Sequence, residues 1–105
     1  MPSSDARAAG AVVAEYHEAQ LRGLLKRLDQ AMARFRADEL DPFEVDQELI
    51  QYNRAAKELW KFCTLGNVVD TARMINEMPP VEWWERGAFR RLVVPRGERT
   101  QADPS

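Results

Sequence analysis

The sequence predicts an all-α fold, built on an antiparallel helical hairpin with a shorter third helix. Apolar residues recur three and four positions apart through two long segments, about 4–37 and 42–63, and this spacing is typical of one face of an α-helix. A strong helix-start signal, Asp41-Pro42, separates the two segments. A third periodic stretch, about 68–78, ends at Pro79-Pro80. Together these patterns predict a small helical bundle.

The first segment, 4–37, is unusually long for a chain of 105 residues. At 1.5 Å per residue it would extend about 50 Å, so we expect part of it to project or to pair with another chain. We expect the first ten or so residues, rich in alanine, to fray. The following positions form its apolar stripe: Ala14, His17, Leu21, Leu24, Leu28, Ala31 and Phe35, with Leu25 and Met32 beside it.

The second segment carries every element of a capped helix start. Asp41 can accept a hydrogen bond from an unpaired amide, Pro42 occupies the first helical position, and Glu44 can return a bond to the cap. A short link between two such helices gives an antiparallel hairpin. We therefore expect the following core contacts: Leu21, Leu24, Leu28, Met32 and Phe35 of the first helix against Leu49, Tyr52, Leu59 and Phe62 of the second.

The rest of the chain is expected to cover one side of this hairpin. Gly66 suits a left-handed position after a helix, and Asn67 can cap the helix over 68–78. Residues 81–86 are expected to form one more turn that lays Trp83 or Trp84 on the bundle. We expect one domain over 1–90 and a basic, disordered tail over 91–105, and we assign no strand to the short apolar run 92–95.

The composition excludes several classes of protein. Fifteen basic and seventeen acidic residues give a net charge of -2, so no global field attracts nucleic acid or a membrane surface. No apolar run approaches the roughly 20 residues of a membrane span, and the N-terminus lacks the pattern of a signal peptide. Cys63 is the single cysteine, which favours a reducing compartment. We expect a cytoplasmic protein with no membrane partner.

The sequence offers no recognisable catalytic, metal or cofactor site. His17 is the single histidine, and it lacks the partners of a di-iron helical motif; a half-buried or interface histidine is favoured over a ligand or a proton carrier. Cys63 lies at a helix C-terminus, where the dipole raises a thiol pKa, and a core role is favoured over a nucleophile. Phosphate loops and common nucleophile motifs are absent. We therefore predict a protein that is not an enzyme and needs no cofactor.

Two segments of opposite charge stand out. The stretch 38–48 holds six acidic residues and no basic one; helix capping explains about half of them, and a weak cation site or a basic partner stays open. A candidate partner-binding set follows near the C-terminus: Trp83, Trp84, Arg86, Phe89, Arg90 and Arg91. Basic groups beside aromatic rings suit a protein partner or single-stranded nucleic acid. In the plainer alternative one tryptophan closes the core and the arginines solubilise a tail. The tail could also fold back on the acidic stretch of its own chain or of a neighbouring chain, because the two segments have opposite charge.

Three short blocks resemble a family of small, uncharacterised helical proteins of high-GC bacteria. The blocks are Asp41-Pro42-Phe43-Glu44, the stretch from Ala55 to Cys63 (AAKELWKFC), and the stretch from Glu82 to Gly87 (EWWERG). Twelve arginines against three lysines agree with a high-GC genome. The resemblance spans about 40–90 and implies an all-α fold in the cytoplasm, with no implied activity.

These observations predict a non-enzymatic helical module that acts through protein contacts, as a homodimer. The long first helix, the many large apolar residues and the missing catalytic set favour it. The alternative is a small nucleic-acid-associated or antitoxin-like regulatory protein, in which arginines between Arg86 and Arg99 contact phosphates.

Overall fold

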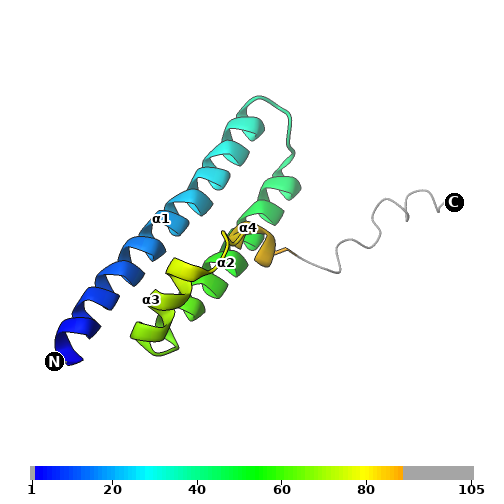
Figure 1. Cartoon of the computed structure of the whole chain (residues 1–105). Coiled ribbons are helices and arrows are strands. Elements are labelled where there is room, and N and C mark those ends of the chain that lie inside the picture. The colour runs from blue at the N-terminus through cyan, green and yellow to red at the C-terminus, as the bar shows by residue number, and fades with distance from the viewer. Residues whose placement is uncertain (1, 89–105) are drawn as a thin grey trace, which may run out of the picture.

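The computed structural model describes residues 2–88, and the side chains of 5–88. Within that range the chain forms four helices and no strand: α1 Pro2–Arg36, α2 Pro42–Thr64, α3 Val68–Glu77 and α4 Trp83–Arg86. α1 and α2 lie side by side as an antiparallel hairpin, and α3 and α4 pack against that hairpin (Figure 1). The predicted all-α bundle is confirmed. The predictions for 91–105, including the run 92–95, lie outside the described residues.

α1 is helical from Pro2 onward, including the stretch for which the sequence predicted fraying. Ala9 of this stretch and Val13 just after it are buried against Ala72 of α3, with each of the three side chains 7% exposed or less. These small side chains allow the two helix backbones to approach closely. From Ala9 onward, α1 is therefore part of the bundle.

The link between α1 and α2 is defined at both ends by hydrogen bonds. Asp38 has a φ of 62°, and the amides of Asp38 and Glu39 donate to the carbonyls of Phe35 and Arg34 at 3.0 and 2.8 Å. This pair of bonds is the Schellman motif, which ends a helix with a left-handed residue. The predicted capping box at the start of α2 is confirmed, because the Asp41 carboxylate accepts from the amide of Glu44 and the Glu44 carboxylate from that of Asp41, both at 2.8 Å.

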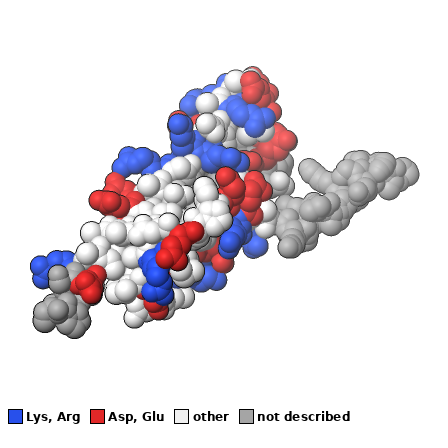
Figure 2. Space-filling view, in the orientation of Figure 1, with Lys and Arg blue, Asp and Glu red and all other residues white. Residues whose placement is uncertain are grey.

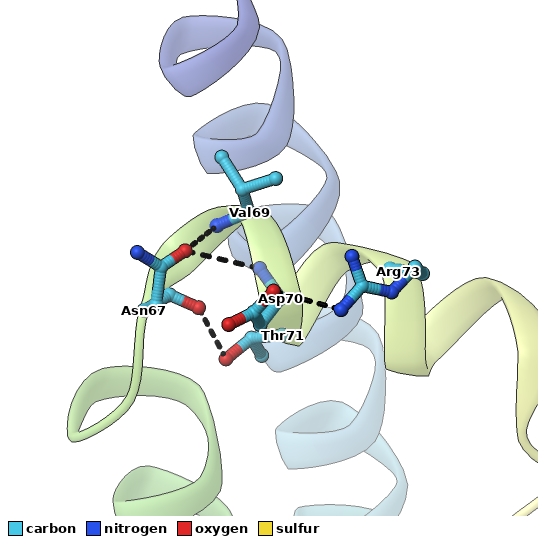
Figure 3. Close-up of polar contacts among 5 residues, drawn as sticks. All are labelled: Asn67, Val69, Asp70, Thr71 and Arg73. Carbon is cyan, nitrogen blue, oxygen red and sulfur yellow. Dashed lines mark hydrogen bonds and ion pairs between the residues drawn. The ribbon is translucent and has the colours of Figure 1, made fainter.

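The link between α2 and α3 differs in part from its prediction. No glycine among the described residues has a positive φ, so Gly66 does not take the left-handed conformation expected of it; α2 ends instead through Leu65, whose amide donates to the carbonyl of Lys61. The predicted cap at Asn67 is confirmed. Its side-chain oxygen accepts from the amides of Val69 and Asp70, at 2.8 and 3.1 Å (Figure 3).

The main core lies where α4 crosses the hairpin. Leu24, Ala55, Leu59, Trp83 and Trp84 are all 6% exposed or less and contact one another.

Three residues that the sequence assigned to the core lie on its margin. Met32, Phe35 and Leu49 are 38%, 36% and 43% exposed. They belong to the half of the hairpin near the α1–α2 link, whereas α3 and α4 cover the other half (Figure 1). Two helices alone leave these side chains partly in water.

Candidate interaction surface

The described part of the C-terminal segment is fixed to the bundle by its first tryptophan. The indole Nε1 of Trp83 donates a hydrogen bond of 2.7 Å to the Tyr16 hydroxyl, which lies 67 positions away on α1. Phe62 contacts both rings, with centroids 5.5 Å from Trp83 and 6.0 Å from Tyr16. Burial raises the pKa of Tyr16, and the bond from Trp83 partly offsets that rise. The indole N–H is therefore satisfied inside the core, as buried tryptophan requires.

The backbone of the same segment docks on α2. The Gln51 side chain donates to the Trp84 carbonyl at 2.8 Å, and the Arg54 guanidinium donates to the Gly87 carbonyl at 3.0 Å. A Cβ atom at Gly87 would lie 2.5 Å from the Gln51 carbonyl oxygen and 2.6 Å from the Ala55 amide nitrogen. Only glycine permits this approach. We call residues 83–87 with these α2 contacts the clasp.

The clasp changes the interpretation of the candidate partner-binding set. Trp83 and Trp84 are 5% and 6% exposed, so neither ring is accessible as an anchor or as a stacking platform. The plainer alternative had one tryptophan closing the core, and here both do so. Arg86 is exposed, with its guanidinium 5.3 Å from the centroid of the Trp83 ring. The other members, Phe89, Arg90 and Arg91, lie outside the described residues.

Two residues were weighed as a ligand or proton carrier and as a nucleophile, His17 and Cys63. Both are half-buried. Burial raises the pKa of the Cys63 thiol, which is the direction predicted from its place at the end of α2. Cys63 packs against both clusters of buried side chains. Among residues 2–88 no group of three or more histidine, cysteine or acidic residues is arranged to hold a metal ion. None of the helices there is long and apolar enough to cross a membrane.

An exposed apolar face lies on the other side of the hairpin. Leu25 and Met32 of α1 are 48% and 38% exposed, and Leu49 and Trp60 of α2 are 43% and 50% exposed. We call these four residues the open face. The two on each helix are spaced seven or eleven positions apart, so they share one side of that helix.

The open face points away from α3 and α4. Leu25 is nine positions after Tyr16, and Trp60 is nine after Gln51; both reference residues contact α4. Nine residues make about two and a half helical turns, so the open-face side chains lie on the opposite side of each helix. The sequence placed Leu25 and Met32 beside the apolar stripe of the first helix and also assigned Met32 to the core. The width of that stripe is the signal that could have indicated a second contact surface.

The side of the hairpin that carries α3 differs from the open face in its surface charge and in two shallow hollows. Figure 2 shows charged side chains grouped near the α1–α2 link and largely uncharged surface over the lower part of α1, with a few charged side chains on α3. A hollow of about 540 Å³ adjoins α4, lined by Met78 to Glu82, Glu85 and Arg86. A smaller hollow of about 270 Å³ lies between Tyr16, Gln20 and Ile75 on one side and the proline link on the other. Neither contains a buried charged group that would fix a ligand.

Comparisons with known proteins add no relative. No family model, curated protein or solved structure matches this chain. The resemblance described above therefore rests on its three blocks alone. Those blocks contain Asp41 and Glu44 of the capping box, Ala55 and Leu59 of the core, and most of the clasp, which are positions that build the fold.

Proposed function

We propose that this chain is a non-enzymatic helical self-assembly module that acts as a homodimer through its open face. The exposure of Leu25, Met32, Leu49 and Trp60 on one side of the hairpin carries the proposal. Large apolar side chains gathered on one face are typical of an interaction site, and tryptophan is enriched among the residues that dominate binding energy.

A second copy of the chain fits this face because a two-helix layer is completed by another two-helix layer. Packing two hairpins face to face gives a four-helix bundle with one shared core. In a twofold dimer the same patch contacts itself, so an apolar face is self-complementary without further features. Beside Leu25, Glu18 and Arg22 form an exposed ion pair, and such mixed charge suits the polar rim of an interface.

The proposal is tested by two variants with matched starting exposure. Trp60 is 50% exposed on the open face and Met74 is 49% exposed on α3. We expect Trp60→Glu to convert the dimer to a monomer, because dimerisation would bury an unpaired charge. Met74→Glu should leave the dimer intact. Light scattering on a sizing column at several loadings gives the mass, and circular dichroism verifies that both variants stay helical. A folded Trp60→Glu protein that remains dimeric would refute the proposed interface.

The nucleic-acid alternative has less support. Its stacking rings included Trp83 and Trp84, which are buried in the clasp, so Phe89 and the arginines between Arg86 and Arg99 would have to supply the binding. Such binding would weaken steeply with salt. A mobility-shift assay at low salt with single-stranded and duplex probes tests it, and the absence of a complex would eliminate this alternative.

A further inference from the structure

A second apolar stripe lies on the first half of α2, about 100° around the helix from the open face. Phe43 is 78% exposed, the highest value among the large apolar side chains of residues 5–88, and Ile50 is 39% exposed. Phe43, Gln47 and Ile50 are spaced four and three positions apart, so their side chains follow one another along a single side of α2. We call these three residues the outer stripe.

The outer stripe runs directly to the point where the described chain ends. Arg54 lies four positions after Ile50 and so continues the stripe by one turn. Its guanidinium donates a hydrogen bond of 3.0 Å to the carbonyl of Gly87. Ala88 is the last described residue. The following segment therefore starts one helical turn from Ile50. Eleven residues of α2 separate Arg54 from Phe43, a rise of about 16 Å, which about five extended residues would span.

The segment that follows has the chemistry to occupy this stripe. Its apolar residues are Phe89, Leu92, Val93 and Val94, and between 89 and 99 it carries four arginines against one glutamate. The facing part of the chain, 38–48, carries six acidic residues and no basic one. Glu44 and Asp46 of that set follow Phe43 by one and three positions, which places them on either side of the outer stripe. The apolar residues of 89–99 thus match the apolar residues of the outer stripe, and its arginines match the acidic residues of 38–48.

We propose that residues 89–99 dock along the outer stripe of their own chain, with apolar side chains on Phe43 and Ile50 and arginines beside the acidic residues of 38–48. Arginine binds carboxylates through charge-assisted and often bidentate hydrogen bonds. Attachment of the segment by the clasp favours the intramolecular contact, because the effective concentration of a short tethered segment is high. The proposal does not depend on the open face.

Limited trypsin digestion of the full chain tests this docking. Cleavage after Arg90, Arg91, Arg96 and Arg99, followed by intact mass spectrometry, reports how often the segment is undocked. We expect Phe43→Ser to accelerate these cleavages roughly tenfold. Leu65→Ser is the control, since Leu65 is 66% exposed at the opposite end of α2, and it should leave the rates unchanged. High salt should also accelerate cleavage, because it screens the arginine–carboxylate contacts.

A second variant separates docking from any effect of Phe43 on helix α2. Phe89→Ser should accelerate cleavage to a similar extent, and combining it with Phe43→Ser should add little, as expected for two residues that share one contact. Equal rates in the wild type and Phe43→Ser, or additive effects in the double variant, would overturn the proposal. Protection that increases with protein concentration would also overturn it, because the segment would then dock on a second copy.

Discussion

The two faces of the hairpin bear the same types of residue in opposite environments. Toward α4, Leu24 and Leu59 are 3% and 0% exposed, while on the open face Leu25 and Leu49 are 48% and 43% exposed. Both faces present apolar residues at helical spacing. They differ because the chain after α2 turns back over one face and leaves the other bare. Burial in this protein is thus decided by where the C-terminal segment returns and less by the periodicity of the two long helices.

The covered face depends on few contacts. α4 has four residues, too few for a helix to be stable alone. It is held by the Tyr16–Trp83 hydrogen bond, by the Gln51 and Arg54 bonds to its backbone, and by the close approach of Gly87 to α2. Removing one of these contacts should therefore lower the free energy of unfolding far more than removing a side chain of the open face.

The largest expected effect comes from Trp83→Ala. This change leaves a cavity in the core and removes the hydrogen-bond donor of the Tyr16 hydroxyl, so we expect the free energy of unfolding to fall by about 3–5 kcal/mol. Trp60→Ala is the comparison on the open face. In urea denaturation at concentrations where both proteins are monomeric, Trp60→Ala should lower the free energy of unfolding much less than Trp83→Ala does. Similar losses for the two variants would show that the faces do not differ as described.

Gly87→Ala tests the clasp by adding a single methyl group. That group would meet backbone atoms of Gln51 and Ala55 at 2.5 to 3.0 Å, and overpacking of this kind costs about 1–3 kcal/mol. Gly23→Ala is the matched control at an exposed position of α1, where nothing lies within 4 Å of the added atom. It should stabilise the protein by up to about 1 kcal/mol, because alanine has the higher helix propensity. The same sign for both changes in thermal denaturation would contradict the close approach.

Asn67→Ala tests how α3 is fixed over α1. The change removes the acceptor for the amides of Val69 and Asp70 and should cost about 1 kcal/mol. Asn67→Asp keeps an acceptor at the helix N-terminus and should retain most of the stability. Hydrogen exchange gives the regional readout: amides of α3 should exchange faster in Asn67→Ala, while those in the middle of α2 change little. Equal acceleration in both places would indicate global unfolding instead.

The smallest expected effect is a dependence of stability on alkaline pH. Burial raises the pKa of both Cys63 and Tyr16 above their ordinary values, so the folded state holds these protons more tightly than the unfolded state. Their contribution to stability is complete below the unfolded pKa of the thiol, about 8.5, and declines as pH rises from there through the folded pKa. Urea midpoints between pH 7 and 10 should decline, and Cys63→Ala should reduce the first part of that decline. A midpoint that rises over this range would contradict the stated direction.

Local signals in the sequence were sufficient for the helices and their caps. Asp41-Pro42 and Asn67 predicted where α2 and α3 begin, because a cap requires residues that are neighbours along the chain. The end of α1 was also predicted closely, at about 37 against the observed Arg36. The conformation that ends it was not predicted, because Asp38 takes the left-handed φ of 62° there, whereas the sequence predicted that conformation only for Gly66, after the second helix.

The candidate surface depends on contacts that no local pattern encodes. Trp83 finds its partner Tyr16 67 positions away, and the return of α4 to that site determines which apolar stripe is covered. The sequence therefore predicted that one tryptophan would lie on the bundle, but it did not predict that both would be buried. For the same reason it assigned Met32 and Leu49 to the core, although they lie beyond the reach of α3 and α4.

The most direct test of the open face is the mass of the wild-type chain by sedimentation equilibrium over a wide range of concentrations. The proposed interface predicts a species of twice the 12.1 kDa chain mass, which dissociates on dilution and is insensitive to moderate salt because the contact is apolar. A single species of 12.1 kDa at every concentration would contradict it, and the open face would then have to be explained without a second copy.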